Sequence, residues 1–206
     1  MNRQYILYRM ADFVTHVVPL RFGYWIGLRV ADRFYRLDKH GRESVISNLR
    51  RVMAHRGVRV SQQTLERLSR RVFQNFGKYL VDFFYYTRLS SEQLRDVVSI
   101  ENPQYLEEVA REGKGGVLVT AHFGSWEIGA GVIGSLGYAV NAVVLPYGDK
   151  RTNALFQARR RSRGMNVIPL GRAARGSLRA IRRGEFVALL ADRDYSPHHD
   201  KVSFFG

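Results

Sequence analysis

Hydrophobic positions change their spacing along the chain near residue 97. Before it, apolar residues recur every three or four positions, as Val45, Leu49 and Val52 do, which is the period of amphipathic helices. After it, short apolar runs alternate with helix-like segments, as in the βαβ units of parallel sheets. The pattern predicts an α/β fold with a mostly parallel sheet flanked by helices, divided into a helical amino-terminal region at 1–96 and an α/β core at 97–206.

The expected elements follow from these periods and from turn residues between them. In the amino-terminal region, helices are expected at 4–18, 21–36, 42–54 and 61–88. Gly77, inside the last of these, is expected to mark a close helix contact or a kink. In the core, strands are expected at 97–100, 116–120, 138–145, 166–169 and 186–191, and helices at 103–111, 125–135, 151–163 and 174–183.

The stretch 116–130 is the one around which the chain is organised. Its apolar run 117–119 predicts a buried strand, which stops just before His122. Gly124 permits a sharp bend, and Ser125 is a candidate N-cap of the helix that follows. Polar groups at the carboxyl end of a strand, beside the positive end of a helix, are a common way to build an active site.

His122 and Glu127 lie five residues apart. Helical neighbours on one face are three or four residues apart, so the two side chains meet only if His122 precedes the helix and Glu127 lies in its first turn. An imidazole held by a carboxylate takes a proton from a hydroxyl in acyl transfer. A His near a Glu is also commonly a satisfied polar pair, and the spacing alone leaves both interpretations open.

Composition favours an anionic partner. The net charge is +15, and residues 150–184 contain eleven Arg or Lys residues and no acid. Such a balance attracts nucleic acid, anionic lipid or an acidic protein, and Arg grips phosphates through two hydrogen bonds. No zinc-finger spacing or aromatic RNA-binding signature supports nucleic acid. The chain has no cysteine, which excludes disulfides and thiolate chemistry.

The first two expected helices are rich in aromatic residues and flanked by arginine. Neither 4–18 nor 21–36 contains the ~18 uncharged apolar residues that a spanning helix needs, and no signal-peptide pattern precedes them. Aromatic and basic side chains together suit the interface of an anionic membrane. The alternative is that these helices cover the core, and the sequence permits both.

The block His122-Phe-Gly-Ser-Trp-Glu127 resembles the His-x4-acid motif of the glycerolipid acyltransferase superfamily. Phe123, Gly124 and Trp126 make it similar to one branch, the bacterial lipid A biosynthesis (lauroyl/myristoyl) acyltransferases. The resemblance implies that His122 is the general base and that Glu127 orients it. Backbone N–H groups of the helix near Ser125 are then available to stabilise an oxyanion, which places Ser125 in the substrate site.

A second block supports the same resemblance. The segment 153–169 places Arg160 ahead of Gly164 and a short strand, as in the second motif of the family. The resemblance implies that Arg160, with Arg163 as the alternative, holds a phosphate or carboxylate group of a substrate. The other two arginines of the run 159–161 are expected on a solvated helix face.

A third block, Asp192-Arg193-Asp194 with 204–206 after it, is similar to the Asp-x-Asp and Phe-Phe-Gly motif of the family. Asp192, Arg193 and Asp194 are therefore placed in the substrate site, where the two acids are expected to pair with arginines of the basic segment. A metal site that adds 198–200 is the alternative, but the spacing matches no closed zinc pattern. Family members continue past this block, so the carboxyl-terminal part of the fold is expected to be missing.

The resemblance implies a membrane-surface acyltransferase that uses neither cofactor nor metal. A fatty acyl chain would move from acyl carrier protein or acyl-coenzyme A to a hydroxyl of a lipid A precursor or related glycolipid or lysophospholipid. The expected location is the cytoplasmic face of the bacterial inner membrane, without nucleic acid. Residues 145–147 lack the Arg of a Tyr-Arg-Pro stretch in lipid A enzymes, which leaves related glycolipids open. The alternatives are a nucleic-acid-binding protein and a truncated, inactive relative that binds membrane.

Overall fold

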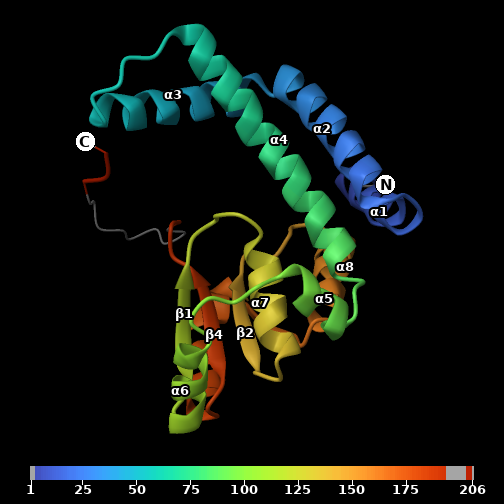
Figure 1. Cartoon of the computed structure of the whole chain (residues 1–206), viewed down its shortest axis with the longest axis vertical. Helices are drawn as coiled ribbons and strands as arrows, with labels where there is room; N and C mark the ends of the chain where they lie inside the picture. Colours follow the sequence, from blue (N-terminus) through green and yellow to red (C-terminus); the bar gives the residue numbers. More distant parts are fainter. Residues whose placement is uncertain (1–2, 194–202, 206) are drawn as a thin grey trace. The chain divides into compact units, whose positions relative to one another are not determined.

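The computed structural model describes residues 3–193 and 203–205 and confirms the predicted α/β fold (Figure 1). The chain forms two compact units. The first, called here the sheet unit, consists of Met1–His16 and Asp82–Asp194. The second, called here the helical unit, consists of Val17–Val81 and Tyr195–Gly206.

The sheet unit is built on four parallel strands in the order β1-β4-β2-β3. Their bounds are β1 Gly116–Thr120, β2 Val140–Val144, β3 Met165–Pro169 and β4 Phe186–Leu190. Four of the five predicted strands are therefore confirmed. All four run in the same direction, so their carboxyl ends lie along one edge, which is where ligands bind in open α/β sheets.

The strand predicted at 97–100 is wrong. Val97 ends a short helix, α5 (Ser91–Val97), and residues 98–100 form no strand. The cause is local: Ser90 accepts a hydrogen bond from the backbone N–H of Gln93, whose side chain accepts one from the N–H of Ser90. This capping box starts a helix, and α5 is held by Leu94, which is 1% exposed.

β1 is an edge strand, which changes the expectation that 117–119 is buried. Val117 is 49% and Val119 69% exposed, whereas Val187 of the neighbouring β4 is fully buried. An apolar run predicts a strand, but burial depends on the strand order, which the run does not contain.

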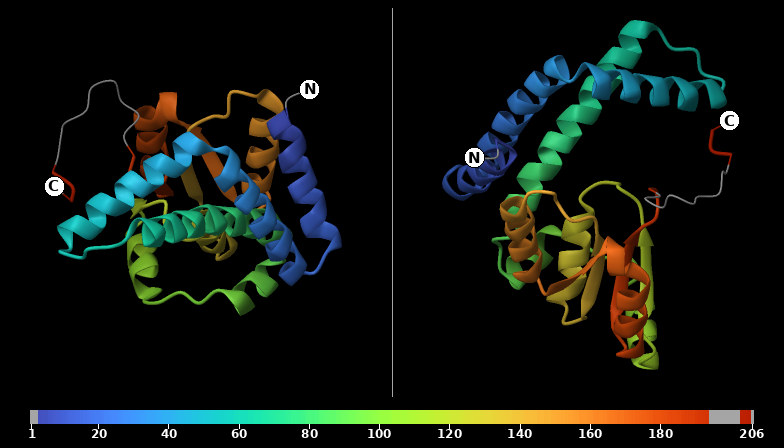
Figure 2. Two further views of the ribbon diagram at one scale, coloured as in Figure 1. Left: turned by 90° about the horizontal axis from the view of Figure 1, so that it is seen from above. Right: turned by 180° about the vertical axis from the view of Figure 1, so that it is seen from behind.

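Helices lie on both faces of the sheet (Figures 1 and 2). α7 covers one face and α9, which contacts β2, β3 and β4, lies behind it on the other. The predicted helices of this region are confirmed with small shifts at their ends. Their bounds are α6 Gln104–Glu112, α7 Trp126–Ser135, α8 Lys150–Arg161 and α9 Ala173–Arg182, the last preceded by a 3-10 turn at Leu170–Arg172.

An aromatic cluster joins the two ends of the sheet unit. Phe83 and Phe84, from the end of α4, pack with Phe156 of α8 in a buried group. Tyr8 of α1 (Arg3–Val17) meets Phe156 edge-on, with ring centroids 5.0 Å apart. The first helix up to His16 therefore belongs to the same compact unit as the sheet.

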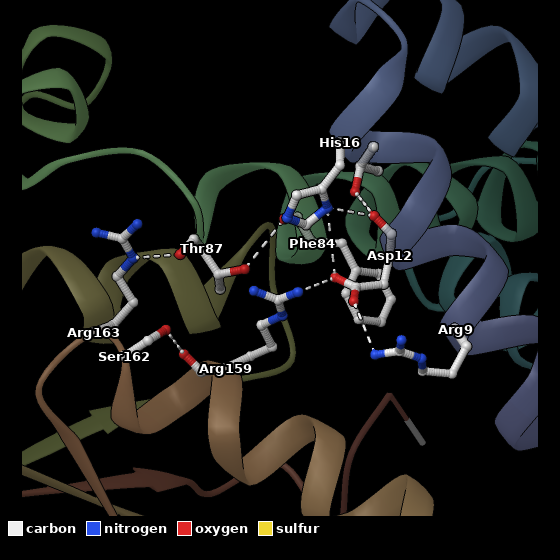
Figure 3. Close-up of polar contacts among 9 residues, drawn as sticks. Arg9, Asp12, His16, Phe84, Thr87, Arg159, Ser162 and Arg163 are labelled. Carbon is white, nitrogen blue, oxygen red and sulfur yellow. Dashed lines mark hydrogen bonds and ion pairs between the residues drawn. The ribbon is translucent and has the colours of Figure 1, made fainter.

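A buried carboxylate fixes α1 in place (Figure 3). Asp12 is 5% exposed, and its Oδ1 lies 2.5 Å from Nη2 of Arg159 on α8. Arg9 approaches the same carboxylate at 3.7 Å. Thr15 Oγ1 and His16 Nδ1 donate to the Asp12 carbonyl at 2.8 and 2.6 Å. Arg159 is thus a structural partner of α1, which corrects the expectation that it lies on a solvated face.

The helical unit contains α2 (Leu20–Leu37), α3 (Lys39–His55) and most of α4 (Gln62–Tyr86). The expected close contact at Gly77 is confirmed, since a Cβ there would lie 2.8 Å from the carbonyl oxygen of Gly27. Nearby, Arg70 donates from Nε and Nη2 to the two carboxylate oxygens of Asp32 at 2.7 and 2.6 Å. These contacts bring α2 and α4 backbone against backbone.

None of the helices in the described ranges combines the length and the apolar character required to cross a membrane.

Candidate active site

The site forms where two neighbouring strands end. Thr120 of β1 pairs with Leu190 of β4, and one further ladder bond runs from the N–H of Ala191 to the carbonyl of Thr120 at 2.9 Å. His122 and Asp192 each lie two residues beyond their strand, so the register places them opposite each other. His122 Nδ1 lies 2.8 Å from Asp192 Oδ1.

The turn after β1 directs the imidazole. Gly124 has φ +60°, a conformation that strains other residues, and this confirms the expected bend. α7 then begins at Trp126, whose ring meets the imidazole edge-on with centroids 4.8 Å apart. His122 is therefore held by a carboxylate on one side and an aromatic ring on another, with 27% of its side chain exposed.

Ser125 occupies the predicted N-cap position of α7, but its side chain makes no capping hydrogen bond. The hydroxyl instead donates to Oδ2 of Asp82 at 3.3 Å. The helix thus begins where the sequence predicted, and Ser125 ties that point to α4. Its predicted contact with substrate stays a prediction.

Asp192 is a charged partner for the imidazole. Burial acts to raise the pKa of Asp192, but hydrogen bonds from the His122 side chain and from the backbone N–H groups of His122 and Asp192 outweigh it, and the pKa is lowered from 3.8. The carboxylate is therefore ionised near neutral pH. Because Nδ1 is used for Asp192, Nε2 is the ring atom through which His122 can reach a substrate.

The predicted pairing of His122 with Glu127 is replaced by a different pair. Glu127 lies in the first turn of α7, and its carboxylate is turned inward, where Arg160 of α8 meets it. Arg160 Nε lies 3.1 and 3.0 Å from the two carboxylate oxygens and Nη2 lies 2.5 Å from Oε1. Both side chains are 9% exposed, so each charge is neutralised within the protein.

The side chains of Arg160 and Arg163 both bind groups of the protein itself. Both arginines were predicted to hold a substrate anion. Arg160 is occupied by Glu127, as above. Arg163 donates from Nε to the carbonyl of Thr87 at 3.1 Å and from Nη2 to the carbonyl of Leu89, and burial lowers its pKa. Figure 3 shows the contact with Thr87. The carboxylate of Glu127 and the carbonyl groups of Thr87 and Leu89 thus bind the two guanidinium groups, so both arginines have partners within the protein.

The third sequence block contributes one residue to the site in an unexpected role. Asp192 was expected to pair with an arginine of the basic segment, and its partner is His122. Arg193 follows at the same edge and is exposed, and its predicted contact with substrate stays a prediction. Asp194 and 198–200, which carried the alternative of a metal site, lie outside the described residues. Within 3–193 and 203–205, no three His, Cys, Asp or Glu side chains are grouped to hold a metal.

Sequence reasoning missed Asp192 as the partner of His122, and also Trp126 and Asp82 as neighbours of the site. A usable signal existed for Asp192. It lies as far beyond β4 as His122 lies beyond β1, and paired parallel strands bring such positions together. Using it required knowledge that β1 and β4 are neighbours.

The fold and the site together define an α/β protein with a histidine–carboxylate pair at the carboxyl edge of a parallel sheet, the arrangement used in general-base catalysis. The particular family follows from comparison with known proteins. Residues 2–206 match the family described as bacterial lipid A biosynthesis acyltransferase, and the chain belongs to that family. The suspected family is thereby confirmed, and with it an acyltransferase in general. A search of curated protein sequences finds no match.

Proposed function

We propose that the chain moves a fatty acyl group from a thioester donor to a hydroxyl of a lipid A precursor or related glycolipid, with His122 as the general base. The single observation that carries the proposal is the hydrogen bond between His122 Nδ1 and Asp192 Oδ1 at 2.8 Å. It gives the exposed edge of the sheet an imidazole of fixed orientation, and it does so within a family of acyltransferases.

The reaction needs no covalent enzyme intermediate. Nε2 of His122 accepts the proton of the substrate hydroxyl as the oxygen attacks the thioester carbonyl. The tetrahedral intermediate then collapses, the C–S bond breaks, and the imidazolium returns the proton to the departing thiolate. Asp192 keeps the other ring proton on Nδ1 and stabilises the imidazolium, which is the role of a carboxylate beside a catalytic histidine.

The start of α7 favours the negative charge of that intermediate. α7 begins at Trp126, four residues after His122, and the first N–H groups of a helix carry a partial positive charge. Donors fixed in advance at the place where charge develops are commonly the largest contribution to such catalysis. This geometry supports the mechanism without a metal or an additional base.

We also propose that the helical unit lies on the membrane that contains the acceptor, at the cytoplasmic face of the bacterial inner membrane. Two exposed aromatic rings of α2 make cation–π contacts. The guanidinium of Arg21 lies 5.0 Å from the ring of Phe22, and that of Arg29 lies 5.5 Å from the ring of Trp25. Rings among cations suit the headgroup level of an anionic bilayer. The same helix also exposes Val30, Phe34 and Leu37.

The reaction is tested with the purified protein, an acylated carrier protein and extracted glycolipid acceptor, with products read by mass spectrometry. We expect the acceptor to gain the mass of one acyl chain, and His122→Ala to slow this gain by about 10²- to 10⁴-fold, the usual contribution of a general base. A His122→Ala protein with the wild-type rate contradicts the mechanism.

Flotation with vesicles of phosphatidylcholine and phosphatidylglycerol tests the membrane proposal. Trp25→Glu should weaken flotation, and Val58→Glu, an exposed change outside α2, should not.

A further inference from the structure

A second basic surface lies on the sheet unit, along α9. Three arginines of α9, at positions 175, 179 and 182, recur every three or four residues, which places them on one face of the helix. Arg172 precedes them at the N-cap of α9, and all four are exposed. The opposite face is anchored by Ala180, which is fully buried. These four arginines are called here the α9 stripe.

No acid of the described residues forms an ion pair with the stripe. Among the described residues, the ion pairs of the sheet unit engage other basic groups, such as Arg183 with Glu185 at 2.7 Å, and none includes a member of the stripe. At a rise of 1.5 Å per residue the stripe is about 15 Å long. A single phosphate group occupies only two adjacent guanidinium groups, so the length fits a row of acids on a partner.

The composition of the stripe distinguishes it from the proposed membrane surface on α2. Helices that lie in a bilayer interface bury apolar and aromatic side chains among their cations, as α2 offers with Phe22 and Trp25. On α9, Leu178 is the large apolar side chain that is exposed, and the helix contains no aromatic residue. Arg172, Arg175 and Arg179 of the stripe line a hollow together with Leu170 and Gly171, and such an arginine-lined surface suits an acidic protein.

The position of the stripe connects it to the site. Its first arginine follows the end of β3 by three residues, and the carboxyl ends of all four parallel strands lie on the edge that holds His122. A partner at the start of α9 therefore lies at the same carboxyl edge of the sheet as the proposed catalytic pair, after β3, which is at the other end of the strand order from β1.

We propose that the α9 stripe docks an acidic carrier protein that delivers the acyl group as a thioester. The inference rests on the proposed function, since it assigns the docking surface for the donor of that reaction. Opposite charges on the two surfaces would steer the encounter and set its orientation, effects that weaken as salt increases.

Binding of the carrier tests the proposal without any chemistry. The affinity of purified holo acyl carrier protein is measured by isothermal titration calorimetry for the wild type and for Arg175→Glu/Arg179→Glu. The matched control is Arg151→Glu/Arg161→Glu, which makes the same change in charge at exposed positions of α8. We expect the α9 variant to bind at least about tenfold more weakly, as for charge reversal in a steering surface, and the control to stay within about twofold.

Three outcomes overturn the proposal: equal weakening by both variants, no weakening by the α9 variant, or no binding of the carrier to the wild type. The milder Arg175→Ala/Arg179→Ala variant, with a melting temperature equal to that of the wild type, excludes misfolding as the cause. Binding of the same variants to anionic vesicles is measured alongside. If the α9 variant loses vesicle binding and keeps carrier binding, the stripe is a lipid surface and the proposal is wrong. Failure of acyl transfer with intact carrier binding contradicts the proposed function and leaves this inference standing.

Discussion

Glu127 and Arg160 form a buried ion pair between α7 and α8, with Arg160 Nη2 2.5 Å from Glu127 Oε1 and both side chains 9% exposed. Glu127 is the acid of the His-x4-acid block, and its carboxylate fixes the first turn of α7 to the neighbouring helix. That turn follows directly from the loop that carries His122. The two ends of one short motif therefore have separate partners, Asp192 for His122 and Arg160 for Glu127, and only the second pair fixes α7 to α8.

Breaking the Glu127–Arg160 pair should destabilise the protein. Arg160→Ala leaves a buried carboxylate without its partner, and such changes cost about 3–5 kcal/mol in the free energy of unfolding. Arg160→Lys should recover only part of this, because an ammonium cannot make the forked contact. Urea denaturation measures both, with exposed Arg161→Ala as the control, which should change stability by less than about 0.5 kcal/mol. Equal stability of the Arg160 and Arg161 variants contradicts the assignment.

Arg159 should hold α1 to the sheet unit through Asp12. With Arg159→Ala, the carboxylate of Asp12, which is 5% exposed, loses its closest cation, and a charge left buried without its partner is unfavourable. Hydrogen exchange of the α1 amides measures the consequence, because local opening exposes them. We expect faster exchange in α1 and unchanged exchange in β4. Unchanged α1 protection would show that the aromatic contacts of Tyr8 are sufficient.

Substitution by alanine should change stability in opposite directions at two glycines, Gly77 in the contact of α2 with α4 and Gly129 of α7. At Gly77 a Cβ would lie 2.8 Å from the carbonyl oxygen of Gly27, so Gly77→Ala should destabilise by about 1–3 kcal/mol, as overpacking does. Gly129 of α7 has nothing within 4 Å of its Cβ position. There Ala should stabilise by about 0.5–1 kcal/mol through helix propensity. The melting temperatures of the two variants test this prediction, and shifts of the same sign in both would contradict the packing argument.

Asp32 should make the stability of the protein depend on pH in the acid range. The hydrogen bonds from Arg70 lower the pKa of Asp32 from 3.8 to about 2, against the opposing effect of burial. A carboxyl with a depressed folded-state pKa stabilises above its unfolded value, and the contribution is lost as the pH falls from about 4 to about 2.

Asp32→Asn measures this contribution. Because the side chain of Arg70 is 48% exposed, solvent screens the pair, and we expect a loss of about 1 kcal/mol at pH 7. Urea denaturation from pH 7 downward should show the wild type and the variant converging below about pH 4. A gap that persists unchanged into that range contradicts the ion-pair interpretation.

Much of the fold follows from local patterns. Four strands and every main helix lie where apolar periods and turn residues predict them, because those signals are contained in short segments. The failures have a common cause in what is not local. Residues 97–100 have strand-like side chains, but a capping box at Ser90 and Gln93 started a helix before them. The exposure of Val117 and Val119 follows from the edge position of β1, which depends on the strand order.

The site shows the same division. His122 and the bend at Gly124 were predicted because they depend on one short stretch. The partner of His122, Asp192, lies 70 residues away, whereas the sequence analysis considered only Glu127, the carboxylate of the same short stretch. Arg160 was expected to hold substrate and Arg159 to lie on a solvated face, because the acids that they pair with, Glu127 and Asp12, lie 33 and 147 residues away. Pairs at such separation are decided by topology.

The rate of acyl transfer by Asp192→Asn tests the central claim most directly, namely that His122 is a base oriented by Asp192. The amide keeps the shape of the side chain but removes the charge that fixes the imidazole tautomer and stabilises the imidazolium. We predict a fall in kcat of about 10²- to 10⁴-fold with little change in KM or melting temperature. Glu127→Gln should instead lower the melting temperature before it affects kcat. Wild-type kcat in Asp192→Asn, with a large loss confined to a still stable Glu127→Gln, would contradict the account.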